Sequence, residues 1–111
     1  GALDIANFSG TTVRLHWTDQ PYIWHINDGQ EVFAVMDGQV AMHVKVDGEE
    51  QVIMLNAGDI FYAGVGCEHV AHPQGAARIL VMEKEGSVCP RGGRFFPRRF
   101  IACQMRHTAL I

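Results

Sequence analysis

The sequence lacks any apolar run long enough to cross a membrane. No stretch of roughly 18 consecutive apolar residues is present. The N-terminal segment, GALDIANFSG, has neither the basic region nor the long apolar stretch of a secretory signal. We therefore expect a cytoplasmic protein that has no membrane partner.

Cysteine is also scarce. The three cysteines, Cys67, Cys89 and Cys103, are odd in number and widely spaced. Disulfide frameworks have an even number of cysteines, and zinc ribbons have closely spaced cysteine pairs. The pattern favours neither class, and we expect reduced thiols.

Acidic residues are absent after residue 85. Residues 1–85 hold all 12 acidic residues and four basic ones, a net charge of −8, whereas residues 86–111 hold five arginines, a net charge of +5. Arginines interleaved with phenylalanines, as in this tail, are typical of flexible single-strand binders. The acidic body argues against a nucleic-acid partner. An arm that contacts a second copy of the chain is favoured instead.

The composition excludes a disordered chain. Apolar residues make up 48% of the 111 residues and charged residues 19%, which is ordinary globular usage. A chain of this length forms one core. We expect one domain over residues 11–85, followed by a basic tail over 86–111. The structure of the tail stays open between a short helix or strand, a dimer arm and disorder.

Short apolar segments separated by turn signals predict an all-β fold. Asp-Gly turns recur at 28–29, 37–38 and 47–48, and the apolar segments between turn signals run about 5 to 9 residues, which suits strands better than helices. The expected strands cover 12–17, 22–26, 31–36, 40–46, 51–55, 60–62, 69–71 and 76–82. So many short strands in one small domain indicate a barrel or sandwich, because closing a sheet removes exposed edges.

The stretch WHINDGQEVF, residues 24–33, sets a histidine, an asparagine and a glutamate close together. His25 and Asn27 share one face of a strand because they are two residues apart. Glu31 is two residues before the apolar Phe33, so the two side chains should lie on the same, inward face of a strand. A carboxylate in the interior is costly unless it is hydrogen-bonded or bound to a cation. Imidazole, amide carbonyl and carboxylate are all donors to divalent transition metals. His69, at the start of a later strand, could supply a second imidazole.

A metal-free interpretation of the same residues stays open. His25, Glu31 and His69 can form a hydrogen-bonded interior trio, and Asn27 can be a turn residue that bonds its own backbone. We assign His43 and His72 to the surface or to strand faces, and His16 and His107 have no partner in the sequence pattern.

Two groups of residues resemble the motifs of the cupin family. His25-x-Asn27-x3-Glu31-x6-Gly38 is similar to the first cupin motif, and Gly58-x5-Gly64-x-Gly66-x2-His69 is similar to the second. The resemblance covers residues 11–85 and is closest to the small single-domain cupins. It implies a double-stranded β-helix, a jelly-roll barrel that is commonly a homodimer.

The resemblance also implies a metal inside the barrel. The family's ligands map onto His25, Glu31 and His69, and Asn27 stands where the family usually has another histidine. An amide oxygen is a weaker ligand than imidazole for iron, nickel or zinc. The divalent metal expected here is iron, nickel, manganese or zinc. Gly64 replaces the usual motif proline, which keeps a turn but loosens it.

The residues therefore predict a small metal-binding cupin that acts on or senses a small molecule. The fold does not name the substrate or the reaction, and a metal-dependent dioxygenase or isomerase would both fit. Trp24, Phe33, Tyr62 and Cys67 are candidate pocket-lining residues, with ordinary core packing as the alternative. The rival function is a metal-free module that binds a small ligand or only dimerises.

Overall fold

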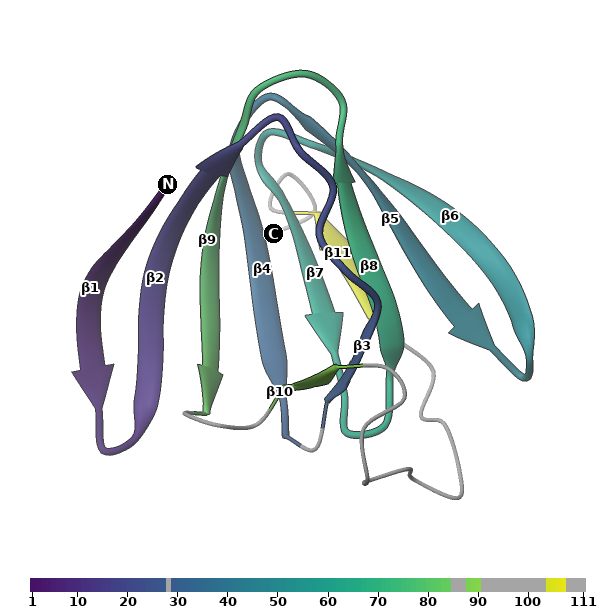
Figure 1. Cartoon of the computed structure of the whole chain (residues 1–111), viewed down its shortest axis with the longest axis horizontal. Helices are drawn as coiled ribbons and strands as arrows, with labels where there is room; N and C mark the ends of the chain where they lie inside the picture. Colours follow the sequence, from purple (N-terminus) through teal and green to yellow (C-terminus); the bar gives the residue numbers. More distant parts are fainter. Residues whose placement is uncertain (28, 85–87, 91–103, 108–111) are drawn as a thin grey trace.

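The fold consists of antiparallel strands (Figure 1). The computed structural model describes residues 1–27, 29–84, 88–90 and 104–107, with side chains up to residue 84 except at 25 and 27. The strands are β1 (Ala2–Phe8), β2 (Thr11–Thr18), β3 (His25–Asn27), β4 (Glu31–Asp37), β5 (Gln39–Val46), β6 (Glu49–Asn56), β7 (Asp59–Ala63), β8 (Glu68–Pro73), β9 (Ala77–Lys84), β10 (Val88–Pro90) and β11 (Gln104–His107). Within these described residues, no helix is long and apolar enough to span a membrane.

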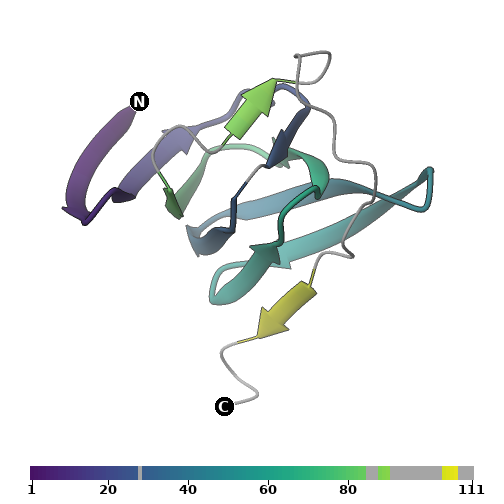
Figure 2. The ribbon, with the colours of Figure 1, turned by 90° about the horizontal axis from the view of Figure 1, so that it is seen from below.

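The strands form two sheets, and the chain passes repeatedly from one sheet to the other. One sheet has the order β1-β2-β9-β4-β7-β11 and the other β10-β3-β8-β5-β6. Strands distant in sequence, such as β2 and β9 or β5 and β8, are therefore neighbours. Seen from below, β1 and β11 lie at the two ends of the six-stranded sheet, and the other strands of that sheet lie between them (Figure 2). This arrangement confirms the predicted all-β jelly-roll barrel.

Most predicted strands are confirmed within one or two residues at each end. The predicted hairpin at 47–48 joins β5 to β6, and both turn residues have positive φ, 52° at Asp47 and 81° at Gly48, as a primed turn requires. The strand expected at 22–26 is shorter and later, since β3 begins at His25. Strands β1 and β10 were not predicted, and the open alternative of a short strand within residues 100–110 holds at 104–107. The other tail residues lie outside the described part.

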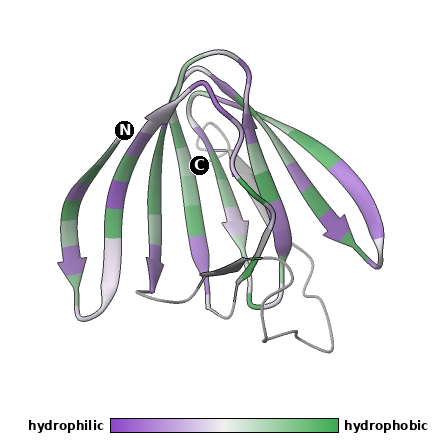
Figure 3. Cartoon of the chain, viewed as in Figure 1, coloured by the Kyte–Doolittle hydropathy of each residue, from purple (hydrophilic) through white to green (hydrophobic). Residues whose placement is uncertain are grey.

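The core lies between the sheets because each strand alternates inward and outward residues. Along β4, Glu31, Phe33 and Val35 are buried while the residues between them are partly exposed. Figure 3 shows apolar and polar residues interspersed along the strands of both sheets. Met42, Leu55 and Phe61 are fully buried, and burial of each such side chain contributes about 1.5–3 kcal/mol. These side chains supply much of the hydrophobic stabilisation.

Gly38, in the turn between β4 and β5, is required by its surroundings. Its φ is +81°, and a Cβ at this position would lie 2.5 Å from the backbone oxygen of Ala76. Only glycine allows both this conformation and this close approach of the next turn. The structure therefore explains why the last residue of the first motif is a glycine.

Candidate functional site

Glu31 and His69 meet inside the barrel. Glu31 is the first residue of β4 and His69 the second of β8, on opposite sheets. Oε1 of Glu31 lies 3.0 Å from Nε2 of His69. The residues are 3% and 0% exposed, so a carboxyl and an imidazole face each other out of water. Such burial is tolerated only where polar groups satisfy one another or bind a cation.

Two aromatic rings position His69. Phe33 meets the imidazole edge to face, with ring centroids 5.5 Å apart and planes at 85°, and Phe61 lies 5.9 Å away at 57°. Edge-to-face contacts restrict a ring to a narrow set of orientations. Apolar neighbours also lower the local dielectric, which strengthens every electrostatic interaction of Glu31 with His69. The pair is therefore held rigidly in an environment that favours tight polar contacts.

The backbone brings the first motif to the second. In the β3–β8 ladder, His25 is directly opposite His69, and Asn27 is opposite Val88 in the β3–β10 ladder. Residues directly opposite in an antiparallel pair have Cβ atoms roughly 4.5–5.5 Å apart. The side chains of His25 and Asn27 lie outside the described part. Among the described side chains, no group of three or more His, Cys, Asp or Glu residues is arranged to hold a metal.

Glu83 joins this site and was not found from the sequence. It lies near the end of β9, directly opposite Glu31 in the β4–β9 ladder. Burial raises the pKa of the Glu83 carboxyl to about 8, aided by a hydrogen bond with Glu31 and by the like charge of Glu31. Two carboxyls this close share a proton because both cannot ionise cheaply. The signal was present, since Glu83 has the inward parity of Ile79 and Val81.

A cavity of about 130 Å³ opens beside the carboxyl pair. Its lining combines carboxyl, imidazole and phenol groups with apolar walls: His16, Tyr22, Glu31, Phe33, Ala71, Val81 and Glu83. The rings of His16 and Tyr22 meet edge to face, 6.1 Å apart. Burial lowers the pKa of His16 and raises that of Tyr22. Both groups therefore favour their neutral forms.

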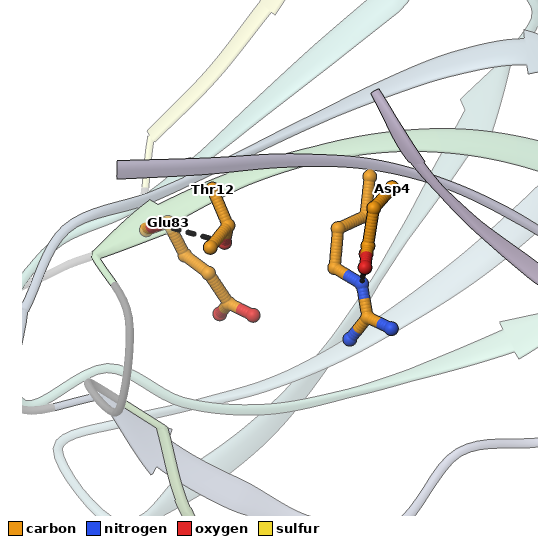
Figure 4. A network of polar contacts seen from close by, with 4 residues as sticks. Asp4, Thr12 and Glu83 are labelled. Carbon is orange, nitrogen blue, oxygen red and sulfur yellow. Dashed lines mark hydrogen bonds and ion pairs between the residues drawn. The ribbon is translucent and has the colours of Figure 1, made fainter. Parts of the chain in front are cut away.

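Glu83 also borders a second, larger groove. This groove has a volume of about 550 Å³ and is lined by Thr12, Arg14 and Asp4 among others. Arg14 forms an ion pair with Asp4, and the Thr12 hydroxyl donates a hydrogen bond to the Glu83 backbone oxygen at 3.1 Å (Figure 4). Although this groove is larger, Glu31 does not line it, whereas Glu31 lines the smaller cavity and contacts His69. We therefore take the smaller cavity as the candidate site.

The four residues expected to line a pocket lie in four different places. Phe33 lines the cavity. Tyr62 lines a different groove, together with Val32 and Met82. Trp24 lies under the ammonium group of Lys45, 5.2 Å from the ring centroid.

Cys67 is fully buried within the hydrophobic core. It is disulfide-bonded, so the expectation of reduced thiols was wrong. An odd number of cysteines leaves one unpaired but does not prevent the other two from pairing.

Two histidines that the sequence did not connect form a separate pair on the second sheet. The rings of His43 (β5) and His72 (β8) are 4.2 Å apart, and Nδ1 of His43 lies 4.0 Å from Oε2 of Glu50. His72 follows His69 by three residues in the same strand, so its parity is opposite and it faces away from the core. The pair therefore provides a reference histidine outside the candidate site.

Comparison with known proteins shows which solved structures have a similar fold. No protein-family model and no curated protein sequence matches the chain. A cupin-2 domain protein from Shewanella frigidimarina is 27% identical, with a TM-score of 0.68 over 77% of this chain and 80% of that one. A cupin superfamily protein from Desulfitobacterium hafniense is 13% identical, with a TM-score of 0.66 over 76% and 75%.

A third similar structure is hydroquinone 1,2-dioxygenase from Sphingomonas sp. TTNP3 with 4-hydroxybenzoate bound. It is 17% identical, with a TM-score of 0.65 over 76% of this chain and 65% of that one. At such identity the likeness concerns the fold alone. The two-sheet topology, the motif residues on β3, β4 and β8, and the similarity to the Shewanella protein together show that this chain belongs to the cupin superfamily.

Proposed function

We propose that this cupin binds one divalent transition metal inside the barrel and acts on, or senses, a small molecule beside it. The ligands are His25, Glu31 and His69, with the amide oxygen of Asn27 as a weaker fourth donor. The observation that carries the proposal is the contact between Glu31 and His69, two buried donors 3.0 Å apart. The register of His25 opposite His69 supports it.

The separation of the two donor atoms fits a coordination shell. Nitrogen and oxygen ligands lie about 2.0–2.2 Å from zinc and similar ions. Two such ligands at a right angle are then about 3 Å apart, which matches the 3.0 Å between Nε2 and Oε1. The donor set of imidazole and carboxylate with an open position is that of non-haem iron enzymes. Iron, nickel, manganese and zinc are all compatible with it.

A bound metal would supply Lewis acidity or a site for dioxygen. The residues of the chain then have separate tasks. Phe33 and Phe61 fix the His69 ring. Glu83 holds Glu31 through a hydrogen bond, and such partners of ligating carboxylates commonly tune metal affinity by about 10–100-fold. A dioxygenase and an isomerase remain the two activity classes.

The proposal includes assembly as a homodimer. Leu3, Ile5 and Phe8 are exposed on β1, the edge strand of its sheet, and an exposed apolar edge favours pairing with another chain. The basic tail over 86–111, outside the 11–85 barrel domain, would be an arm in that contact. The expected cytoplasmic location is not part of the proposal, because a disulfide at Cys67 is unusual in a reducing compartment.

Metal analysis tests the proposal directly. The purified chain is reconstituted with iron, nickel, manganese or zinc, and bound metal is counted by mass spectrometry. We expect one ion per chain, and an affinity at least about 100-fold lower in Glu31→Ala and His69→Ala, since each removes a ligand. His72→Ala is the matched control because it removes a histidine from the same strand on the opposite face. Substoichiometric metal with all four ions, or equal loss in the control, contradicts the proposal.

The alternative function is a metal-free module that binds a small ligand. It is favoured by the direct contact of Glu31 with His69 and its hydrogen bond with Glu83, which can satisfy the buried groups without an ion. A ligand that binds only the folded state raises the melting temperature. A shift with small organic ligands but none with any of the four metals would favour the module.

A further inference from the structure

The cavity beside Glu31 has the size of a single ring. Its volume is about 130 Å³, close to the roughly 150 Å³ of an engineered apolar cavity that admits benzene. The walls from β4, β8 and β9 carry Phe33, Ala71 and Val81, which offer apolar contact. A ligand of about one six-membered ring therefore fills the space between these walls.

The polar side of the cavity selects against anions. Glu31 and Glu83 both line it, and no lysine or arginine is among its described lining residues. Among the described residues, Arg14 lines the adjacent groove rather than this cavity and is ion-paired with Asp4. A carboxylate ligand would meet the negative carboxyl pair in a low-dielectric site, which is strongly unfavourable. Neutral and cationic ligands avoid this repulsion.

One oxygen at the site has an unused capacity to accept a hydrogen bond. Oε2 of Glu83 is buried and has no hydrogen-bond partner within the described part of the chain. The side chain extends away from the backbone carbonyl that Thr12 occupies (Figure 4). Buried polar atoms are nearly always partnered in folded proteins. A group in the cavity that donates a hydrogen bond would satisfy this oxygen.

We propose that the cavity binds a single-ring molecule, neutral or cationic, that donates a hydrogen bond to Oε2 of Glu83. Phenols and benzylamine-like amines belong to this class, and ring carboxylates do not. Glu83 is the residue that determines this specificity. The inference rests on the proposed function only in placing the small molecule beside the Glu31–His69 pair, and it does not require the metal.

Three probes of matched size test the inference: phenol, benzylamine and benzoate. Binding to the full chain is measured by calorimetry or ligand-observed NMR, before and after chelation of metal. We expect phenol and benzylamine to bind at least about tenfold more tightly than benzoate, because a buried charge without a partner is costly. Benzoate binding as tightly as the other two probes to the metal-free chain would overturn the inference.

Variants locate the specificity. Glu83→Leu removes the acceptor oxygen and should weaken phenol and benzylamine at least about tenfold, whereas Glu83→Gln keeps an acceptor oxygen and should change both affinities less than about threefold. Glu49→Leu makes the same change at an exposed position on β6 and should alter neither affinity. Ala71→Leu fills the cavity and should abolish binding of both probes. Unchanged phenol and benzylamine affinity in a folded Glu83→Leu, or unchanged binding in a folded Ala71→Leu, contradicts the proposal.

The two proposals can fail separately. If the chain binds no metal but the metal-free form discriminates between the probes as expected, the metal function is wrong and the ligand class stands. If one metal binds per chain but the probes bind without discrimination, the ligand class is wrong and the metal function stands.

Discussion

The interior of the barrel has two contrasting regions. One is packed with apolar side chains such as Met42, Leu55 and Phe61, all fully buried. The other holds the contact of Glu31 with His69 and, beside it, a cavity lined by Glu31 and Glu83. Close packing stabilises the first region, whereas burial of ionisable groups in the second costs free energy unless they bind one another or a ligand. The comparison indicates that stability and binding are located at different places in one small core.

The largest expected effect is in the apolar region. Leu55→Ala should lower the free energy of unfolding by about 2–5 kcal/mol, because Leu55 is fully buried and a cavity would remain. Urea denaturation measures this change. Val52→Ala, at a position of β6 that is 55% exposed, should change stability by less than about 0.5 kcal/mol. Equal losses in the two variants would contradict the claim that close packing of buried side chains stabilises this region.

The turn that closes the first motif should show the next largest effect. Gly38→Ala should cost about 1–3 kcal/mol, because an alanine is strained at φ +81° and its Cβ meets the Ala76 carbonyl at 2.5 Å. Gly48 has the same φ with nothing within 4 Å, so Gly48→Ala measures the conformational cost alone. The difference between their denaturation midpoints gives the cost of the clash, and similar midpoints would show that the turn can move.

The pH dependence of stability tests the polar region. Burial and the neighbouring Glu31 raise the pKa of Glu83 from 4.5 to about 8, so between these values the folded chain binds more protons than the unfolded chain. Stability from Glu83 is therefore fully present below pH 4.5 and is lost as the pH rises through about 8. Urea midpoints of the metal-free chain should fall across this window, and the fall should be smaller in Glu83→Gln. A slope that is unchanged by this substitution, as expected for Glu49→Gln, contradicts it.

The smallest expected effect is at the rim of the cavity. Burial, followed by the nearby charge of Arg14, lowers the pKa of His16 below its ordinary value of 6.5. An NMR titration of the imidazole protons should place its midpoint below 6.5. Filling the cavity with phenol should lower the midpoint further, because the ring would exclude water from His16. A midpoint above 6.5 would mean that Glu31 outweighs burial.

Much of the fold follows from local patterns. Period-two alternation and the Asp-Gly turns predicted the strands from β2 to β9, because inward and outward residues are set by neighbours in the chain. Strand β1 was missed since its apolar residues Leu3, Ile5 and Phe8 are exposed and its pairing with β2 is what makes it a strand. Local pattern gives no information where a strand depends on its partner.

The candidate site, too, could be predicted from the sequence only in part. The sequence by itself determined that Glu31 faces inward and that His69 begins a strand, since both follow from parity and turn position. Only the tertiary structure decided that Glu83 lies opposite Glu31, that the cavity forms between β4, β8 and β9, and that Cys67 is disulfide-bonded. The physical reason is that strand pairing and cavity shape depend on packing between segments far apart in the chain, which no local periodicity specifies.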